Sequence, residues 1–408
     1  MPSFDTIAMT LLLLSSLLLA AFWLIVIHRI RKTLRQLPSA RDGAESARAN
    51  PPEESVCVIV PAHNESDVIE GLVRSLRAQR YAGPIRFLFA LDRCTDDTER
   101  IAREAFGDDD RFEIIEIREC PADWAGKVNA IWTAVNQSET ARSSDLLLFA
   151  DADTIFDPDL VAAAVALLRD RDLEMLSLWS TLSVRHWFEW LVQPACGLEL
   201  MYQYPLLRAN RHEERRAFAN GQFILFRRDA YDAMGGHEAV NEAVLEDMAL
   251  ARLAADRGMR AGVFYDEGML QVRMYETWDS FYRGWKRIYI DCTKRKLTRL
   301  WKSAWRIRST GTVLPLVVLL ALVLSSAGVG GAPAWLRWST LGASSIATML
   351  WTGTLGWIYH KGRFPIWAMP LHPIGCWIAG TILLHALRDL KSGRPVRWGG
   401  KEYLLQPR

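Results

Sequence analysis

Apolar stretches of two different lengths alternate along the chain and predict two kinds of structure. Near the N-terminus, the stretch from Ile7 to Ile27 carries no charged residue. Its length matches the ~20 apolar residues that a helix needs to cross a bilayer. Shorter apolar runs begin at residue 56, and long ones return after residue 312. This order predicts a membrane-anchored chain with a folded domain between its membrane segments.

The shorter apolar runs predict the strands of a mainly parallel sheet. They cover residues 56–60, 85–91, 112–117 and 146–150, and helical periodicity occupies the stretches between them. Because these runs are mainly apolar and alternate with helices, we expect a Rossmann-like α/β fold whose sheet is covered by helices on both faces. Polar residues follow the ends of these runs, so the carboxyl edge of the sheet is the expected functional site.

The C-terminal apolar stretches predict a membrane region. Val313 to Leu324 with its flanks, and Leu341 to Tyr359, are expected to span the bilayer. The stretch from Phe364 to Leu387 is interrupted by prolines, and its short uninterrupted part favours a shallow, non-spanning segment. Three spans rather than four would return the basic C-terminal tail to the same side as the domain.

Basic residues next to the apolar stretches predict the orientation. Arg29, Arg31, Lys32 and Arg35 follow the first span at once, which is the reverse of the pattern of a cleavable signal peptide. The positive-inside rule then places the domain in the cytoplasm. The basic residues within 294–308 favour contact with an anionic leaflet. We expect an integral protein of a bacterial plasma membrane.

Aromatic and amphipathic stretches predict helices at the membrane surface near residues 184–204 and 276–308. For the first stretch, a pair of core helices fits the same pattern equally well. The resulting division of the chain is an N-terminal anchor (1–36), a linker (37–54), an α/β domain (55–292), a C-terminal membrane region (309–388) and a cytoplasmic tail (389–408).

The overall composition narrows the possible functions. A hydrophobic content of 50% with 24% charged residues suits a soluble domain joined to a few membrane segments. The formal net charge of +2 provides no basic field for binding nucleic acid. The 6 cysteines form no C-x-x-C pair, which argues against a disulfide framework and a zinc site and is typical of a reducing compartment.

Carboxylates at predicted element boundaries are the strongest candidates for chemistry. Asp151 and Asp153 follow a buried strand, and two carboxylates at a strand end make an oxygen-ligand site for Mg²⁺ or Mn²⁺. Asp247 begins a predicted helix, where it is placed to accept a proton from a hydroxyl group. The alternative roles are helix capping for the pair and an ordinary first-turn acid for Asp247.

Several motifs occur in one order, each at an element boundary. They are Pro61-Ala-His-Asn64-Glu65, Asp92, Asp151-Ala-Asp153, Asn220-Gly-Gln222, Gly235-Gly236 and Glu246-Asp247. In this order and spacing, residues 55–290 resemble a family 2 glycosyltransferase with the GT-A fold. The flanking membrane segments resemble those of lipid-acceptor members, such as the ceramide glucosyltransferase, hopene-associated and carotenoid-associated branches.

The resemblance implies a nucleotide-sugar donor, with UDP as the expected nucleotide. In the roles it implies, Glu65 and Asp92 contact the base and ribose, Lys127 contacts a phosphate, Asp151 and Asp153 hold the metal, and Asp247 is the base. Lys127 also fits a solvated lysine, and both nucleoside contacts also fit turn caps. Acceptor contacts are assigned to Gln222, His237 and Glu246, although a single histidine is more often structural.

The family's arginine–tryptophan signature is incomplete in this chain. Gly284 precedes Trp285, where the resemblance implies an arginine. Arg283 or Arg287, which lie beside Trp285, would then have to bind the diphosphate. This departure favours a single transfer to a lipid over processive synthesis of a polysaccharide.

The predicted function is an inverting transfer of a sugar from a UDP-sugar to a lipid hydroxyl at the cytoplasmic leaflet. The partners are then a lipid acceptor and membrane lipids, without nucleic acid. Two alternatives stay open, a processive polysaccharide synthase and a catalytically inactive membrane scaffold. The presence of Asp92, Asp153 and Asp247 together argues against the scaffold.

Overall fold

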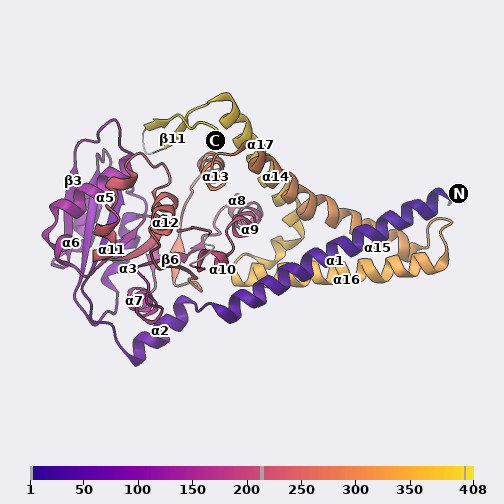
Figure 1. Cartoon of the computed structure of the whole chain (residues 1–408), viewed down its shortest axis with the longest axis horizontal. Coiled ribbons are helices and arrows are strands. Elements are labelled where there is room, and N and C mark those ends of the chain that lie inside the picture. Colours follow the sequence, from indigo (N-terminus) through magenta and orange to yellow (C-terminus); the bar gives the residue numbers. More distant parts are fainter. Residues whose placement is uncertain (1–2, 212–215, 399–400) are drawn as a thin grey trace.

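An α/β domain and a long helical arm make up the molecule (Figure 1). The computed structural model describes residues 3–211, 216–398 and 401–408. The arm consists of α1 (Phe4–Gln36), α15 (Leu314–Ala327) and α16 (Ala334–Lys361), which pack along one another. The domain lies at the end of the arm away from the N-terminus.

A seven-stranded sheet forms the centre of the domain, in the order β3-β2-β1-β4-β8-β6-β9. Its strands are β1 (Val56–Ala62), β2 (Ile85–Asp92), β3 (Phe112–Ile117), β4 (Leu146–Ala150), β6 (Met175–Trp179), β8 (Phe223–Arg227) and β9 (Ala261–Tyr265). Only β8 runs antiparallel to its neighbours, β4 and β6, within this sheet. The predicted mainly parallel sheet is therefore confirmed.

Helices cover both faces of this sheet, as the unbroken apolar strands predict. One face carries α2 (Ala40–Ala49), α3 (Ile69–Arg77), α4 (Thr98–Phe106) and α7 (Leu160–Asp170); the other carries α5 (Gly126–Gln137), α6 (Glu139–Ser143), α11 (Arg228–Ala233) and α12 (Glu246–Asp256). Successive residues of β1 alternate between the two cores, with Val58 and Val60 in the first and Cys57 and Ile59 in the second.

The stretch 37–54, which the sequence predicts as a linker, contains α2. The buried side of this helix consists of Ala40, Gly43, Ala44 and Ala47. A Cβ atom at Gly43 would overlap α7, so the two helices pack at close range. Because the buried residues are only alanine and glycine, the mean hydropathy of this stretch is low, and the helix is not evident from its apolar content.

A second, three-stranded sheet lies beside the carboxyl end of β4. It pairs β5 (Thr154–Phe156) with β10 (Leu270–Val272), and β10 with β7 (Thr181–Leu182). These strands are two or three residues long, which is too short for an alternating pattern to predict them. Their importance is positional, because β5 begins directly after Asp153.

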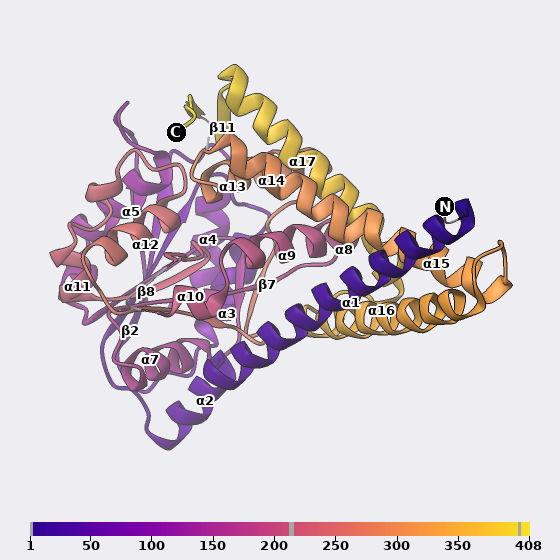
Figure 2. The same ribbon diagram turned by 45° about the vertical axis from the view of Figure 1, so that its right-hand side comes forward.

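A helical layer joins the domain to the arm. It contains α8 (Trp187–Leu191), α9 (Gln193–Gln203), α10 (Leu206–Ala209), α13 (Trp278–Cys292), α14 (Leu297–Arg308) and α17 (His372–Ser392). Helices α14 and α17 lie side by side (Figure 2). In the stretch 184–204, the inner sides of α8 and α9 fit the alternative of core helices. There Phe188 and Cys196 pack against α13 and α17. Trp187 and Tyr202 remain exposed on the outside.

Three helical segments of the described chain are long and apolar enough to cross a membrane: Phe4–Gln36, Leu297–Ala327 and Ile366–Ser392. The first two contain the predicted spans from Ile7 to Ile27 and from Val313 to Leu324. The third covers the segment predicted to be shallow, while α16, which contains the predicted span from Leu341 to Tyr359, is not one of these three segments of the described chain. The prolines do not interrupt α17, because Pro373 lies in its first turn, where proline is tolerated.

The C-terminal residues return to the domain. A two-stranded hairpin of β11 (Val396–Trp398) and β12 (Lys401–Tyr403) follows α17. Leu405 is buried, and the Arg408 backbone N–H donates a hydrogen bond to the Arg295 carbonyl. The stretch expected to be a tail therefore packs on the folded part of the molecule.

Candidate active site

A cavity of about 1020 Å³ opens at the carboxyl ends of β1, β2 and β4 and extends to the helical arm. At the sheet it is lined by the acidic and basic side chains that the sequence singled out, including Glu65, Asp92, Lys127, Asp151 and Asp247. At the other end it is lined by apolar side chains of α1, such as Trp23. One continuous space thus joins a charged site to the membrane helices.

Asp151 and Asp153 follow β4 and face this cavity. Asp153 Oδ1 is buried and has no hydrogen-bond partner among the described residues. Burial raises the pKa of Asp151, although the Lys127 ammonium beside it opposes that rise. Burial and the nearby carboxylates of Asp151 and Glu65 raise the pKa of Asp153 well above its usual range.

These two aspartates fit a divalent cation. A buried carboxylate oxygen without a partner, among like charges, is an environment that a cation would stabilise. The described residues contain no cluster of three or more acidic, histidine or cysteine side chains that could hold a metal alone. Mg²⁺ is usually bound by only one or two carboxylates together with substrate phosphates. The donor set is therefore suited to a metal that binds together with a phosphate ligand.

Lys127 links the carboxylate of Asp151 to that of Glu246 on α12. It lies in the first turn of α5, and its Nζ is 2.6 Å from Asp151 Oδ1 and also pairs with Glu246. Burial opposes the charge on the Lys127 ammonium, but Asp151 and Glu246 outweigh it and raise the pKa of Lys127. Burial would raise the pKa of Glu246, yet Lys127 holds it below its usual range. Lys127 and Glu246 are therefore a stable ion pair at neutral pH.

Asp247 lies in the first turn of α12 and lines the same cavity as Asp153. Its Oδ2 accepts a hydrogen bond of 2.9 Å from the Gly221 N–H, and Oδ1 accepts one from the Met248 N–H. A Cβ atom at Gly221 would lie 3.2 to 3.3 Å from Glu246, Asp247 and Lys127, so the backbone of this loop approaches all three closely. Burial, and then the charge of Glu246, raise the pKa of Asp247 to about 7. A carboxylate with this pKa is suited to act as a general base near neutral pH.

Asp92 is the last residue of β2, Glu65 follows the end of β1, and both line the cavity. Asp92 accepts two hydrogen bonds, of 2.8 and 2.7 Å, from the guanidinium of the adjacent Arg93. The backbone N–H of Glu65 donates to Thr98 Oγ1 at 2.8 Å. Burial, together with the charges of Asp151 and Asp96, raises the pKa of Glu65 to about 7. This part of the cavity is thus rich in hydrogen-bond acceptors.

The sequence pattern of the glycosyltransferase-like family 2 matches residues 51–290, which is more than half of the chain. The chain belongs to this family. Among its relatives, the 4,4'-diaponeurosporenoate glycosyltransferase of Staphylococcus aureus strain MRSA252 is 24% identical over 366 residues, covering 86% of this chain and 89% of the relative. The same enzyme of strain USA300 matches to the same extent.

Solved structures similar to this glycosyltransferase include two with low identity. A mannosyltransferase from Pyrobaculum calidifontis, in complex with GDP-Man and Mn²⁺, is 16% identical with a TM-score of 0.46, covering 93% of this chain and 98% of the other. Residues 1–349 of S. aureus TarS are 14% identical with a TM-score of 0.39, covering 86% of this chain and 96% of the other.

The arginine–tryptophan region of the glycosyltransferase lies on α13. Trp285 and Arg287 line the cavity, and the Trp285 Nε1 is buried without a hydrogen-bond partner among the described residues. Arg287 is buried, and this burial lowers its pKa despite the nearby Tyr275 and Glu246. Arg283 does not line the cavity and pairs instead with the exposed Asp279 at 2.5 Å. The structure therefore brings Arg287, and not Arg283, to the active site.

Of the three predicted acceptor contacts, two line the cavity and His237 does not. Gln222 lines the cavity, and its Oε1 accepts hydrogen bonds from Ser180 and from Asn220, the latter at 3.0 Å. Glu246 lines it as the partner of Lys127. His237 is buried behind the site, 2.8 Å from the Tyr231 hydroxyl, and its ring packs edge-on against Phe149. Burial lowers the pKa of His237 to about 3, so it is a neutral core residue that does not reach an acceptor.

Sequence reasoning missed four residues that line or support the active site of this glycosyltransferase. Arg93 pairs with Asp92, and its position directly after that motif was the available signal. Arg273, Tyr275 and Tyr403 line the cavity from segments that carry no recognisable motif. They reach it only through strand pairing and the return of the C-terminal residues, which the sequence does not reveal.

Proposed function

We propose that this membrane-associated glycosyltransferase transfers a sugar from a UDP-sugar to the hydroxyl group of a membrane lipid. The observation that carries the proposal is the continuity of the cavity, because one space joins the carboxylates at the sheet to the apolar side chains of the arm. A water-soluble nucleotide sugar suits the first end, and a lipid suits the second. The reaction would occur where the two ends meet, between Asp153 and Asp247.

The donor side of the cavity offers a partner for each part of a nucleotide sugar. Glu65 and Asp92 are placed to accept hydrogen bonds from the ribose and the base. Asp153, with Asp151, would hold Mg²⁺ or Mn²⁺, and this ion would supply Lewis-acid neutralisation of the diphosphate. Trp285 lines the same space, and its indole N–H is the donor that it could offer to a phosphate or sugar oxygen.

The acceptor side provides a base. Asp247, deprotonated above pH about 7, accepts the proton of the acceptor hydroxyl. The hydroxyl oxygen then forms a bond to the anomeric carbon while the bond from that carbon to the diphosphate breaks, and UDP leaves. A single displacement of this kind inverts the anomeric configuration. The N–H of Gly221 holds the Asp247 carboxylate in place for the transfer.

The end of the cavity at the helical arm favours a lipid acceptor. Its lining there is mainly apolar and comes from the membrane helices and α9: Phe22, Trp23 and Val26 from α1, Leu198 and Met201 from α9, and Trp357 from α16. A soluble acceptor would have no need for such a surface. The relative named for transfer to diaponeurosporenoate is consistent with an acceptor of this kind.

The orientation follows from charge. Arg29, Arg31, Lys32 and Arg35 lie at the domain end of α1, and the positive-inside rule places this end in the cytoplasm. We therefore propose that the sugar is added at the cytoplasmic leaflet. A bacterial plasma membrane is the membrane we expect.

The test is release of UDP or GDP from a panel of nucleotide sugars by the full chain in membranes that contain its native lipids, with Mn²⁺ or Mg²⁺. In the active combination, Asp247→Asn should lower transfer by about 10²–10⁴-fold, the usual contribution of general-base catalysis, and leave UDP affinity nearly unchanged. Asp256→Asn is the control, because Asp256 is an exposed acid at the other end of the same helix.

Two results would contradict the proposal. Retained transfer by the Asp247→Asn variant would remove this residue from the base role. Failure of every nucleotide sugar to release its nucleotide in the presence of native lipids would overturn the donor and acceptor assignments together. Mass spectrometry of the product should show one added sugar, whereas a ladder of lengths would favour the processive synthase.

A further inference from the structure

Arg273 lies directly opposite Asp153 across a pair of strands. β10 runs antiparallel to β5 with Val272 opposite Thr154, and the next pair along is Arg273 and Asp153. The Arg273 N–H donates a 2.9 Å hydrogen bond to the Asp153 carbonyl, which continues the pairing. Side chains of directly opposed residues project from the same face of a sheet, about 5 Å apart at their Cβ atoms. The strand register therefore places Arg273 next to Asp153, and both residues line the cavity.

The guanidinium of Arg273 is available for a ligand. Arg273 is exposed and lines the cavity. Within the described part of the chain, its side chain makes no hydrogen bond or ion pair, whereas Lys127 is held between Asp151 and Glu246. Of these two cations that line the cavity, Arg273 is thus the one whose donors are not already used by carboxylates of the described residues.

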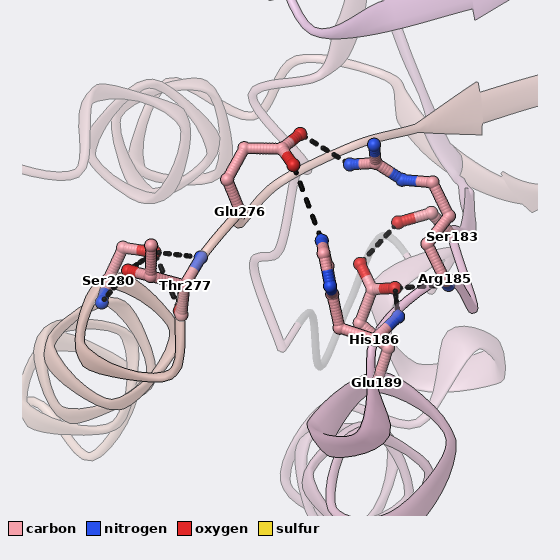
Figure 3. Close-up of polar contacts among 7 residues, drawn as sticks. All are labelled: Ser183, Arg185, His186, Glu189, Glu276, Thr277 and Ser280. Atoms are coloured by element: carbon pink, nitrogen blue, oxygen red, sulfur yellow. Dashed lines mark hydrogen bonds and ion pairs between the residues drawn. The ribbon is translucent and has the colours of Figure 1, made fainter.

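The segment that carries Arg273 is held firmly in place. Tyr275 packs over Gly284 of α13 so closely that any side chain at position 284 would overlap its ring. Glu276 pairs with Arg185 and lies 3.3 Å from His186 Nε2, which ties the segment to the start of α8 (Figure 3). Thr277 then caps α13. With three attachments in a row, the backbone at Arg273 is fixed relative to Asp153.

We propose that Arg273 binds the diphosphate of the donor and of the departing nucleotide. Its planar fork of N–H groups matches phosphate oxygens in a bidentate arrangement. The side chain lies on the same wall as the metal aspartates, while Arg287 lies with Trp285 on α13. The inference rests on the proposed function and adds the residue that holds the phosphates beside the metal side of the site.

The experiment compares UDP with uridine, because only UDP carries the phosphates. Affinities of the full chain in detergent with Mn²⁺ are measured by calorimetry, or by competition where uridine is weak. Arg273→Gln should weaken UDP binding about tenfold or more, the loss expected for hydrogen bonds to a charged group, and leave uridine affinity unchanged. The UDP affinity of Arg273→Lys, which keeps the charge but not the fork, should lie between that of Arg273→Gln and that of the unaltered chain.

Arg171→Gln is the matched control, since it removes the same charge from an exposed arginine that does not line the cavity. Its UDP-to-uridine affinity ratio should equal that of the unaltered chain. If the unaltered chain binds UDP and Arg273→Gln leaves the UDP-to-uridine affinity ratio unchanged, the role of Arg273 alone is overturned. Absence of UDP binding by the unaltered chain would instead overturn the proposed donor, and GDP would be the next nucleotide to test.

Discussion

At the scale of single residues, the pKa of Asp247 predicts how the rate depends on pH. Its pKa of about 7 means that the carboxylate is protonated, and unable to act as a base, in much of the enzyme below neutral pH. The value of kcat/KM for the acceptor, measured at saturating donor, should therefore rise as pH increases through about 7 and then level off. This profile is measured by nucleotide release at a series of pH values.

Glu65 also has a pKa of about 7 and must be distinguished from Asp247. The rising limb should persist in Glu65→Gln, because that residue faces the nucleoside end and not the acceptor. In Asp247→Glu, the limb should move, since the new carboxylate has a different length and surroundings. Loss of the limb in Glu65→Gln would assign the titration to the donor side and contradict the base role of Asp247.

The sequence identified the residues at strand ends and missed those brought in by other elements. Glu65, Asp92 and Asp151 could be placed together because the carboxyl ends of parallel strands share one edge of the sheet. Arg273 could not be placed, because its position depends on the register of two strands only three residues long. For His237, composition alone cannot distinguish a cavity residue from one buried against Phe149 and Tyr231.

At the scale of elements, α13 and the segment before it form one unit whose fit depends on Gly284. A Cβ atom at this position would overlap the ring and hydroxyl of Tyr275. Gly284→Ala should therefore displace Tyr275 and lower the free energy of unfolding by about 1–3 kcal/mol, as overpacking of a core does. It should also raise the KM for the donor, because Arg273 and Trp285 lie on the displaced parts. Thermal unfolding and donor kinetics measure the two effects.

Gly353→Ala is the control for this substitution. Gly353 lies within α16 with no heavy atom near the position of an added Cβ, so alanine is accommodated and stability is unchanged or slightly increased. If Gly284→Ala were as stable and active as the control, the close contact between Tyr275 and α13 would not hold the site. No side chain fits beneath Tyr275 at position 284, so the arginine that the resemblance implies there has no room in this chain.

The sheet was predictable because its first four strands are mainly apolar and long enough to show a pattern. β1 to β4 were found in this way, and their helices followed from periodicity. Two kinds of element escaped. Helix α2 buries only alanine and glycine, so its hydropathy resembles that of a linker. The short strands β5, β7 and β10 exist because of their pairing partners, which lie more than 80 residues apart in the chain.

At the scale of the whole molecule, contacts at the two ends of the arm define its path. At the far end, the Gly331 N–H donates to Asp5, so the start of α1 lies beside the turn between α15 and α16. At the near end, the Tyr265 hydroxyl donates a 2.7 Å hydrogen bond to the Lys361 carbonyl, so α16 ends at the domain. α1 and α16 therefore run the length of the arm, and the shorter α15 packs against both.

The arm is suited to a membrane at its far part only. With 33 residues, α1 is about 50 Å long, which exceeds the ~30 Å hydrocarbon core. Exposed tryptophans occur near both ends of this region, with Trp335 and Trp338 at the far end and Trp301 and Trp305 near the domain. Tryptophan is enriched at both membrane interfaces. The domain end of α1, with its basic residues, then remains outside the bilayer.

This arrangement predicts that the domain and the C-terminus lie on the same side of the membrane. α17 packs on α13 and α14 beside the domain, and Arg408 reaches the carbonyl of Arg295. A protease site added after Arg408 should therefore be cut from the same side as one inserted in the exposed turn at Gly107, and a site at Gly330 only from the opposite side. Sealed vesicles of known orientation provide the measurement. Cleavage of the Arg408 site together with the Gly330 site would mean that α17 crosses the bilayer, in keeping with its hydropathy, and that its packing beside the domain does not persist in the membrane.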